Sequence, residues 1–193
     1  MDGIGLIPGI GEIADLTNGT LYLIQGNRTD AILSATSAIP FVGWFSAGAK
    51  FAKRTISLTN GLKTVLKWVR MSGDVIKFGD RGQLRKVLNM AVGDARQAHH
   101  ILPWGKQGHR AIQKAAKAAN PFHMNELLNG IPLNNLVHNG SHAAYDANVL
   151  RRLNLIPVNA TPDQTKIEIL DIISDIRNAM QNNPTTHVNY LVF

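Results

Sequence analysis

Residues 98–103 read AHHILP, and residues 138–142 read HNGSH. These two stretches contain four of the seven histidines in a chain of 193 residues. The first is a short apolar run that ends in proline, which predicts a strand leading into a loop. In the second, the histidines are four residues apart, and on a helix this spacing brings both imidazoles to one face, where they can chelate a single cation. Gly140 costs about 1 kcal/mol in a helix interior, so a turn at residues 139–140 is the alternative.

The adjacent pair His99 and His100 poses a geometric problem. Neighbouring residues on a regular strand point to opposite faces of the sheet. Both imidazoles serve one site only where the strand frays toward Pro103, or where the site wraps around the end of the strand. The sequence leaves both alternatives open.

The region from Leu84 to Leu150 resembles the HNH (ββα-metal) nucleases and, among them, the AHH-type toxin nucleases. Four stretches carry the resemblance in order: LRK at 84–86, AHHILP, NGIPL at 129–133 and HNGSHAAY at 138–145. The spacing from the asparagine of NGIPL to the two later histidines is that of the colicin-type DNases. The resemblance implies an α+β, mostly helical fold, in which a ββα-metal core carries added helices.

The same resemblance implies the roles of five residues. His99, His138 and His142 would hold one divalent metal ion, and His100 would be the general base that takes a proton from water, a role suited to a group with a pKa near 6.5. Asn129 would brace the loop between the two strands. The chain has no cysteine, so thiolate ligands are excluded. Three imidazoles favour Zn²⁺ or Ni²⁺ in affinity, and Mg²⁺ and Mn²⁺ are the alternatives for the working ion.

One feature departs from the colicin pattern. About thirty residues separate His100 from Asn129, with a predicted helix at 107–119 between them, and AHH-type domains match this arrangement better. The insertion leaves the shape of the DNA-facing surface open.

The net charge of +7 is concentrated in the middle of the chain. Residues 50–117 hold fifteen Lys and Arg against three Asp, whereas residues 1–49 carry −3 and residues 118–193 carry −2. Such a block attracts a polyanion by phosphate neutralisation and counterion release, although solvated helix faces would also explain it. The predicted contacts with nucleic acid are Lys106, Arg110, Lys114 and Lys117.

The first third of the chain has a different composition. Residues 31–49 hold no charged side chain and reach the length of a membrane span. Pro40, two glycines and several hydroxyl residues interrupt the run, so we expect a buried helical hairpin and no stable membrane span. The composition changes abruptly near Lys50, and the chain is therefore divided into segments 1–54 and 55–193, with the nuclease core at about 84–153.

Residues 1–54 resemble the pre-toxin segments of bacterial polymorphic toxins. The stretches that carry this resemblance are GLIPGIGE at 5–12, TNG at 17–19 and AIPFVG at 38–43. It implies a secreted bacterial effector that acts in the cytoplasm of a recipient cell. It also implies a cognate immunity protein, and an acidic one would suit the basic block.

Hydrophobic periodicity completes the expected secondary structure. Helices are predicted at 59–69, 82–92, 107–119, 141–153 and 161–181, a strand or loop at 74–82, and a terminal strand at 187–193. The last of these helices should turn Ile167, Leu170, Ile173 and Ile176 inward. His109 is expected to be a surface residue or to contact a phosphate, His123 is expected in the core, and no partner is identified for His187.

Three alternatives to a DNA-cleaving toxin remain. The first is an HNH nuclease that is not a toxin, and the second is a membrane-active protein in which residues 1–49 insert and the basic part binds anionic lipid. The third is a structural metal-binding module, for which His100 would have no obvious use. RNA is possible as a substrate in place of DNA.

Overall fold

The computed structural model describes residues 51–58 and 63–193. The helical hairpin expected within residues 31–49 lies outside this range. The strands are β1 (Phe51–Ser57), β2 (Lys63–Arg70), β3 (Ile76–Lys77), β4 (Gln97–His100) and β5 (Gly130–Leu133). The helices are α3 (Gln83–Val87), α4 (Arg110–Ala115), α5 (Ala143–Leu155) and α6 (Pro162–Asn182). The described residues also form short 3₁₀ helices at Ser72–Asp74, Trp104–Lys106, Leu127–Asn129 and Asn135–Val137, and a last one at Val188–Tyr190 follows α6.

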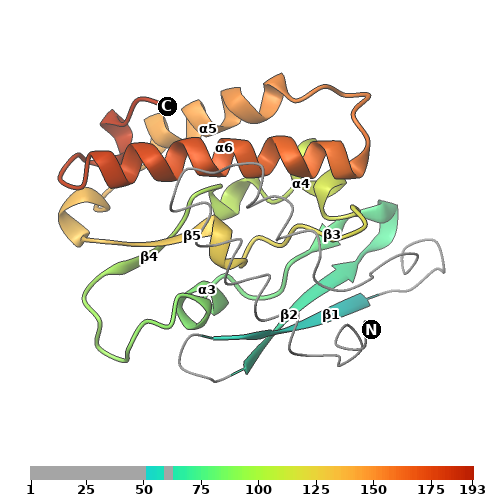
Figure 1. Ribbon diagram of the computed structural model, residues 1–193, viewed down its shortest axis with the longest axis horizontal. Coiled ribbons are helices and arrows are strands. Elements are labelled where there is room, and N and C mark those ends of the chain that lie inside the picture. Colours follow the sequence, from blue (N-terminus) through green and yellow to red (C-terminus); the bar gives the residue numbers. More distant parts are fainter. Residues whose placement is uncertain (1–50, 59–62) are drawn as a thin grey trace, which may run out of the picture.

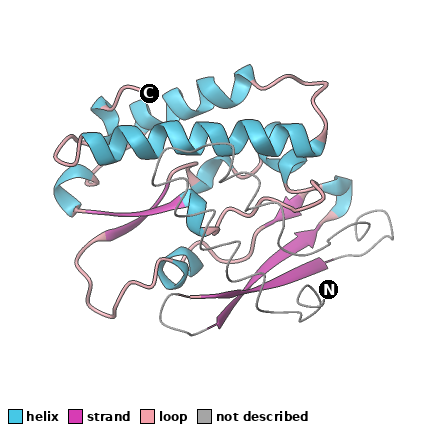
Figure 2. Ribbon diagram, in the orientation of Figure 1, coloured by secondary structure: helices cyan, strands magenta, loops and turns pink. Residues whose placement is uncertain are grey.

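Two small antiparallel sheets lie on one side of a helical layer. Strands β1, β2 and β3 form the first sheet in that order, and β4 pairs with β5 to form the second. Helix α6 runs across the layer above them, with α5 on its outer side and α4 packed against it (Figures 1 and 2). This mixed architecture confirms the predicted α+β class.

Strand β2 replaces most of the helix predicted at 59–69, of which residues 59–62 lie outside the described part. Leu66 and Trp68 are fully buried while Lys67 between them is exposed, which is the alternation of a strand. The Trp68 indole donates a hydrogen bond to the Phe122 carbonyl at 2.8 Å. The helix prediction was wrong because apolar residues spaced three and four apart in a short segment also fit a strand, and pairing with β1 decides between the two.

Helix α6 confirms the predicted helix at 161–181, with one correction. The Thr161 hydroxyl accepts from the backbone of Gln164, and the Gln164 side chain accepts from the Thr161 backbone, which is a complete capping box. Ile173 and Ile176 are buried as predicted, but Ile167 is 40% exposed. The prediction for Ile167 was wrong because the buried face turns through Ile169 instead.

Three other predicted elements are shorter or different. Helix α3 occupies only the first half of the predicted range 82–92, and α4 occupies only the middle of the range 107–119. Asn89 adopts a positive φ of 51° just after α3, a conformation that a continuing helix excludes. The terminal strand predicted at 187–193 is a 3₁₀ helix that packs against α5, and within the described residues this segment has no strand partner.

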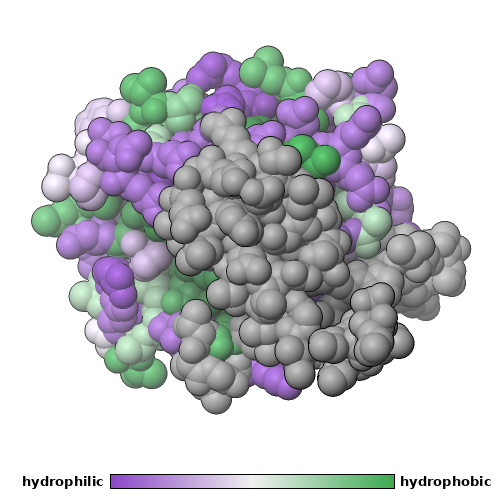
Figure 3. All heavy atoms as spheres, viewed as in Figure 1, coloured by the Kyte–Doolittle hydropathy of each residue, from purple (hydrophilic) through white to green (hydrophobic). Residues whose placement is uncertain are grey.

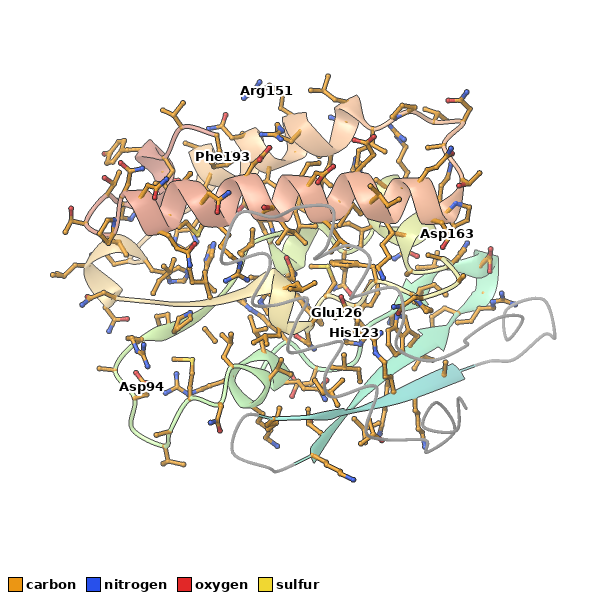
Figure 4. All side chains as sticks on the ribbon, viewed as in Figure 1. Asp94, His123, Glu126, Arg151, Asp163 and Phe193 are labelled. Carbon is orange, nitrogen blue, oxygen red and sulfur yellow. The ribbon has the colours of Figure 1, made fainter. Side chains whose placement is uncertain are left out.

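A buried ion pair joins the first sheet to the segment before β5. Arg54, in β1, forms a salt bridge with Glu126 and donates to the Asn120 side chain at 2.8 Å. Glu126 and the neighbouring His123 lie in the interior below α6 (Figure 4). Because β1 extends from Phe51 to Ser57, it runs across the segment boundary that we expected after residue 54.

The outer surface of the helical layer is mixed in character. Among the described residues that are visible in the upper part of the space-filling view, hydrophilic side chains predominate, with smaller hydrophobic groups between them (Figure 3). Exposed apolar residues such as Leu155 and Val158 are scattered on the surface, as is usual for a folded domain. No helix within residues 51–58 and 63–193 combines the length and the apolar character that a membrane crossing requires.

His123 is a structural histidine, as predicted. Its ring lies edge-on to Trp68 at 4.6 Å and to Phe78 at 5.3 Å between centroids. Its Nδ1 accepts from the Asn125 backbone, and its Nε2 donates to the Lys67 carbonyl, both at 3.0 Å. Burial is the main cause that lowers the pKa of His123 to about 3.

This pKa predicts a loss of stability in acid. An unfolded histidine has a pKa of about 6.5, so the unfolded chain binds a proton between about pH 6.5 and 3 that the folded chain does not. The contribution of neutral His123 to the free energy of unfolding is fully present above about pH 6.5. It is lost by up to ~1.4 kcal/mol per pH unit as the pH falls from there toward about 3. His123→Gln keeps a donor toward Lys67 and removes the titration. Urea unfolding at several acidic pH values should give a shallower dependence on pH for the variant, and equal slopes would contradict this assignment.

Candidate metal and catalytic site

The pairing of β4 with β5 fixes the position of the two adjacent histidines. His99 lies opposite Ile131 and His100 opposite Gly130. Beyond the strand, the Ile101 amide still donates to the Asn129 carbonyl at 2.9 Å. The regular strand ends at His100, and this one hydrogen bond continues the pairing toward Pro103. The two side chains follow the alternation of a regular strand and enter different surroundings.

Gly130 allows a close approach behind β5. A Cβ atom on Gly130 would lie 2.6 Å from Cδ1 of Leu84 and 3.1 Å from Cδ2 of Leu88. Leu84 is fully buried. Because glycine stands opposite His100, α3 packs directly against the strand pair.

The second pair of histidines lies in a turn and not on one helix. His138 follows the 3₁₀ helix Asn135–Val137, and His142 is the residue before α5. Gly140 between them has a φ of +67°, a left-handed conformation that favours glycine. The helical reading of HNGSH was therefore wrong, and the alternative of a turn at residues 139–140 is correct.

Three histidines from two segments, β4 and the turn before α5, meet beside the strand. The ring of His99 lies 4.6 Å from that of His138 and 5.9 Å from that of His142, and the latter two are 4.3 Å apart. One nitrogen from each ring lies within 4.8 Å of the others, which makes the group a candidate metal site. Tyr145 packs against His99 at 5.1 Å and donates to the Ile101 carbonyl at 2.5 Å.

The chemistry of this group fits a divalent cation. Nitrogens bound to Zn²⁺ at about 2.0–2.1 Å in a tetrahedral site are roughly 3.4 Å apart, so small ring rotations would suffice here. Nε2 of His99 and Nε2 of His142 are buried and have no hydrogen-bond partner within the described residues. Burial, followed by the nearby His138, holds the pKa of His99 well below its usual value. Burial and then His142 lower the pKa of His138 to about 4. Neutral imidazoles are the form that binds metal.

His100 has a defined tautomer. The Asn125 amide nitrogen donates to the Asp80 carbonyl at 2.8 Å, so its Oδ1 must face Nε2 of His100, which lies 2.9 Å away. Nε2 of His100 therefore carries the hydrogen, and the lone pair is on Nδ1. Burial, opposed by the bond to Asn125, lowers the pKa of His100 to about 4. The ring is thus neutral near pH 7, the state in which it can accept a proton.

Asn129 connects three backbone segments. It is fully buried, and its Oδ1 accepts from the Leu102 amide at 2.7 Å. Its Nδ2 donates to the Met124 carbonyl at 2.8 Å. These contacts lie behind the strand pair and involve none of the site histidines.

The four predicted nucleic-acid contacts lie on or near α4, and three of them have intramolecular partners. Arg110 donates to the Ile156 carbonyl at 2.6 Å, and Lys114 donates to the Val158 carbonyl at 2.6 Å. Lys117 forms a salt bridge with Asp74 at 2.5 Å. Lys106 ends the 3₁₀ helix Trp104–Lys106. A phosphate would have to compete with these partners, so contact with nucleic acid stays a prediction for this group.

Sequence reasoning missed four residues around the site. Asn125 orients His100, and Arg81 is an exposed cation whose charge acts on His99, His100 and His138. His187 and Asn189 bond the turn between His138 and His142. None of the four carries a local signal, because each is brought to the site by a segment distant in sequence.

Replacing Asn129 tests its bracing role. Asn129→Ala leaves the Leu102 amide and the Met124 carbonyl buried without a partner, at about 1–3 kcal/mol each. We expect the free energy of unfolding, measured with urea, to fall by about 2–6 kcal/mol. Asn134→Ala is the matched control, because this exposed residue bonds only the local Leu136 amide. Unchanged stability in Asn129→Ala with lost cleavage would instead assign it a part in the chemistry.

Comparison with known proteins agrees with this geometry. Residues 84–180, half of the chain, match AHH, a nuclease family of the HNH/ENDO VII superfamily with conserved AHH. The matched region extends from α3 almost to the end of α6 and contains the AHH sequence at residues 98–100. No curated protein and no solved structure matches the chain. The chain therefore belongs to the AHH family and is a metal-dependent endonuclease that hydrolyses phosphodiester bonds.

Proposed function

We propose that this endonuclease cleaves DNA with one divalent cation held by His99, His138 and His142 and with His100 as the general base. The observation that carries the proposal is the convergence of three imidazole nitrogens within 4.8 Å, next along the chain to a fourth histidine of fixed tautomer. A structural metal site would have no use for that fourth histidine.

His100 is suited to accept a proton from water. Asn125 occupies Nε2, so only Nδ1 can act as the base, and no hydrogen bond to Nδ1 is found within the described residues. A base oriented in this way by a third group is a recurring arrangement in hydrolytic sites. Trp104, 5.2 Å from the His100 ring, covers another side of it.

The bound cation would stabilise negative charge on the phosphate and on the leaving oxygen as a Lewis acid. An all-imidazole ligand set favours Zn²⁺ or Ni²⁺ in affinity, and Mg²⁺ and Mn²⁺ are the alternatives for the working ion. His99 is held in place by β4 and by Tyr145, so its ring is preorganised before any ion binds.

Arg81 is the best-placed cation to contact a substrate phosphate. The Asp80 carbonyl, one residue before it, bonds Asn125, and Asn125 bonds His100. This chain of contacts places the Arg81 backbone beside the base. The side chain is exposed, and within residues 51–58 and 63–193 it forms no ion pair. A guanidinium can bind two phosphate oxygens at once.

We further propose that the chain is a toxin, secreted by a bacterium and active in the cytoplasm of a recipient cell. The resemblance of residues 1–54 to pre-toxin segments supports this role. A cognate immunity protein would protect the producing cell, and the charge of the basic block between residues 50 and 117 favours an acidic partner. Co-expression of the chain with an acidic neighbouring gene product, scored by survival of the host, tests this pairing.

Cleavage assays test the site directly. Purified protein is incubated with plasmid DNA or with RNA, in Mg²⁺, Mn²⁺, Zn²⁺, Ni²⁺ or EDTA. We expect metal-dependent cleavage of DNA that falls by about 10²–10⁴-fold in His100→Ala, because general base catalysis is lost. Metal binding should persist in that variant and be lost in His142→Ala.

His109→Ala is the matched control for these variants. His109 caps α4 and bonds Asn154, away from the cluster, so cleavage should stay close to wild type. Cleavage of RNA but not of DNA would support the proposed site and would show that the substrate is RNA. Folded protein that cleaves neither substrate with any metal, or His100→Ala with full activity, would contradict the proposal.

Arg81→Gln tests the phosphate contact. Loss of a charged hydrogen bond worth about 1.5–3 kcal/mol should lower kcat/KM by roughly 10–100-fold. Lys86→Gln removes the same charge from an exposed position on α3 and is the control. If both substitutions lowered kcat/KM equally, Arg81 would act only through the overall positive charge of the protein and not through a specific phosphate contact.

A further inference from the structure

The C-terminal segment at residues 187–189 lies beyond the region that matches the family, yet it contacts the loop that carries two of the site histidines. Nε2 of His187 lies 2.8 Å from the Asn139 carbonyl, and Nδ2 of Asn189 donates to the Ser141 carbonyl at 2.6 Å. Both carbonyls belong to the turn between His138 and His142. The C-terminal end of the chain lies beside the beginning of α5 (Figure 1).

His187 uses both of its ring nitrogens. Nδ1 accepts from the Asn189 amide at 3.3 Å, so Nε2 carries the hydrogen and donates to the Asn139 carbonyl. The ring lies 6.2 Å from that of His142. In contrast to His99 and His142, it has no nitrogen left over for an ion. The geometry thus assigns His187 to holding the loop and not to the ligand set.

Asn189 extends the same contact to helix α5. While its Nδ2 bonds Ser141, its Oδ1 accepts from the Tyr145 amide at 3.1 Å, in the first turn of the helix. Tyr145 in turn packs against His99. Within the described residues, residues 139–141 take part in no backbone–backbone hydrogen bond with any other residue. The turn around Gly140 therefore depends on the C-terminal segment for its conformation.

We propose that His187 and Asn189 are positioning residues of the metal centre, which fix residues 139–141 and so set the distance between His138 and His142. The inference rests on the proposed metal site. Groups that orient ligands from outside the coordination sphere typically change metal affinity by 10–100-fold when removed. A segment outside the matched region would thus be a working part of the site.

Two substitutions at position 187 separate the two bonds of the ring. Asn places an acceptor near the position of Nδ1, which keeps the bond from Asn189 and removes the donor to Asn139. Gln places a donor near the position of Nε2 and removes the acceptor. Asn189→Ala is a second variant that removes the bond to Ser141. Val192→Ala is the control in the same segment, because Val192 is 90% exposed.

The measurement is calorimetric titration of each full-length protein with Zn²⁺ alone, after circular dichroism has shown that it is folded. We expect His187→Asn and Asn189→Ala to bind Zn²⁺ at least about tenfold more weakly, and His187→Gln and Val192→Ala to stay close to wild type. Recovery with Gln is the signature of positioning, because a merely structural role would be impaired by both substitutions at position 187.

Three results would overturn the inference. His187→Asn and Asn189→Ala could bind Zn²⁺ as tightly as the wild type does. His187→Gln could lose as much affinity as His187→Asn, which would attribute the loss to general destabilisation. Folded wild-type protein could fail to bind Zn²⁺ at all, in which case the metal assignment fails first and the positioning role fails with it. Only this last result also counts against the proposed function.

Discussion

The antiparallel pairing of β4 with β5 is the constraint on which the site depends. It fixes His99 and His100 at the end of one strand, with the His99 imidazole in the histidine cluster and the His100 imidazole against Asn125. The same strand pair is secured from behind. Asn129 bonds the Leu102 and Met124 backbones, and Arg177 of α6 donates to the Gly130 carbonyl at 2.9 Å. Buried backbone groups require such partners, so polar side chains are drawn into the interior here.

Burial affects several histidines alike, and their hydrogen bonds distinguish what they do. Burial is the first cause that lowers the pKa of His99, His100, His123 and His138. His123 has a partner on each nitrogen, which marks it as part of the core. His99 keeps a buried nitrogen without a partner within the described residues, and His100 bonds Asn125 through one nitrogen only. A buried imidazole nitrogen without a hydrogen-bond partner costs free energy of folding unless a ligand binds it. Histidines that have such a nitrogen therefore mark the site.

Local patterns predicted the long helices better than the sheet. Helix α6 has its capping box, its proline in the first turn and a regular apolar repeat, all within one continuous stretch of sequence. Strand β2 carries an apolar spacing that fits a helix as well as a strand, and only its pairing with β1 excludes the helix. The 3₁₀ helix Val188–Tyr190 likewise follows from contacts with α5 and not from its own pattern.

The sequence by itself determined the kind of chemistry. Four histidines in two short motifs, an asparagine at a fixed spacing and the absence of cysteine predicted an HNH-type nuclease, and they predicted that imidazoles hold its metal ion. Only the tertiary structure decided how these parts are held. The tautomer of His100 follows from its hydrogen bond to Asn125, and the turn before His142 is hydrogen-bonded by His187 and Asn189. The reason is physical: a ligand motif is read from neighbours along the chain, whereas orientation comes from hydrogen bonds between segments that become neighbours only on folding.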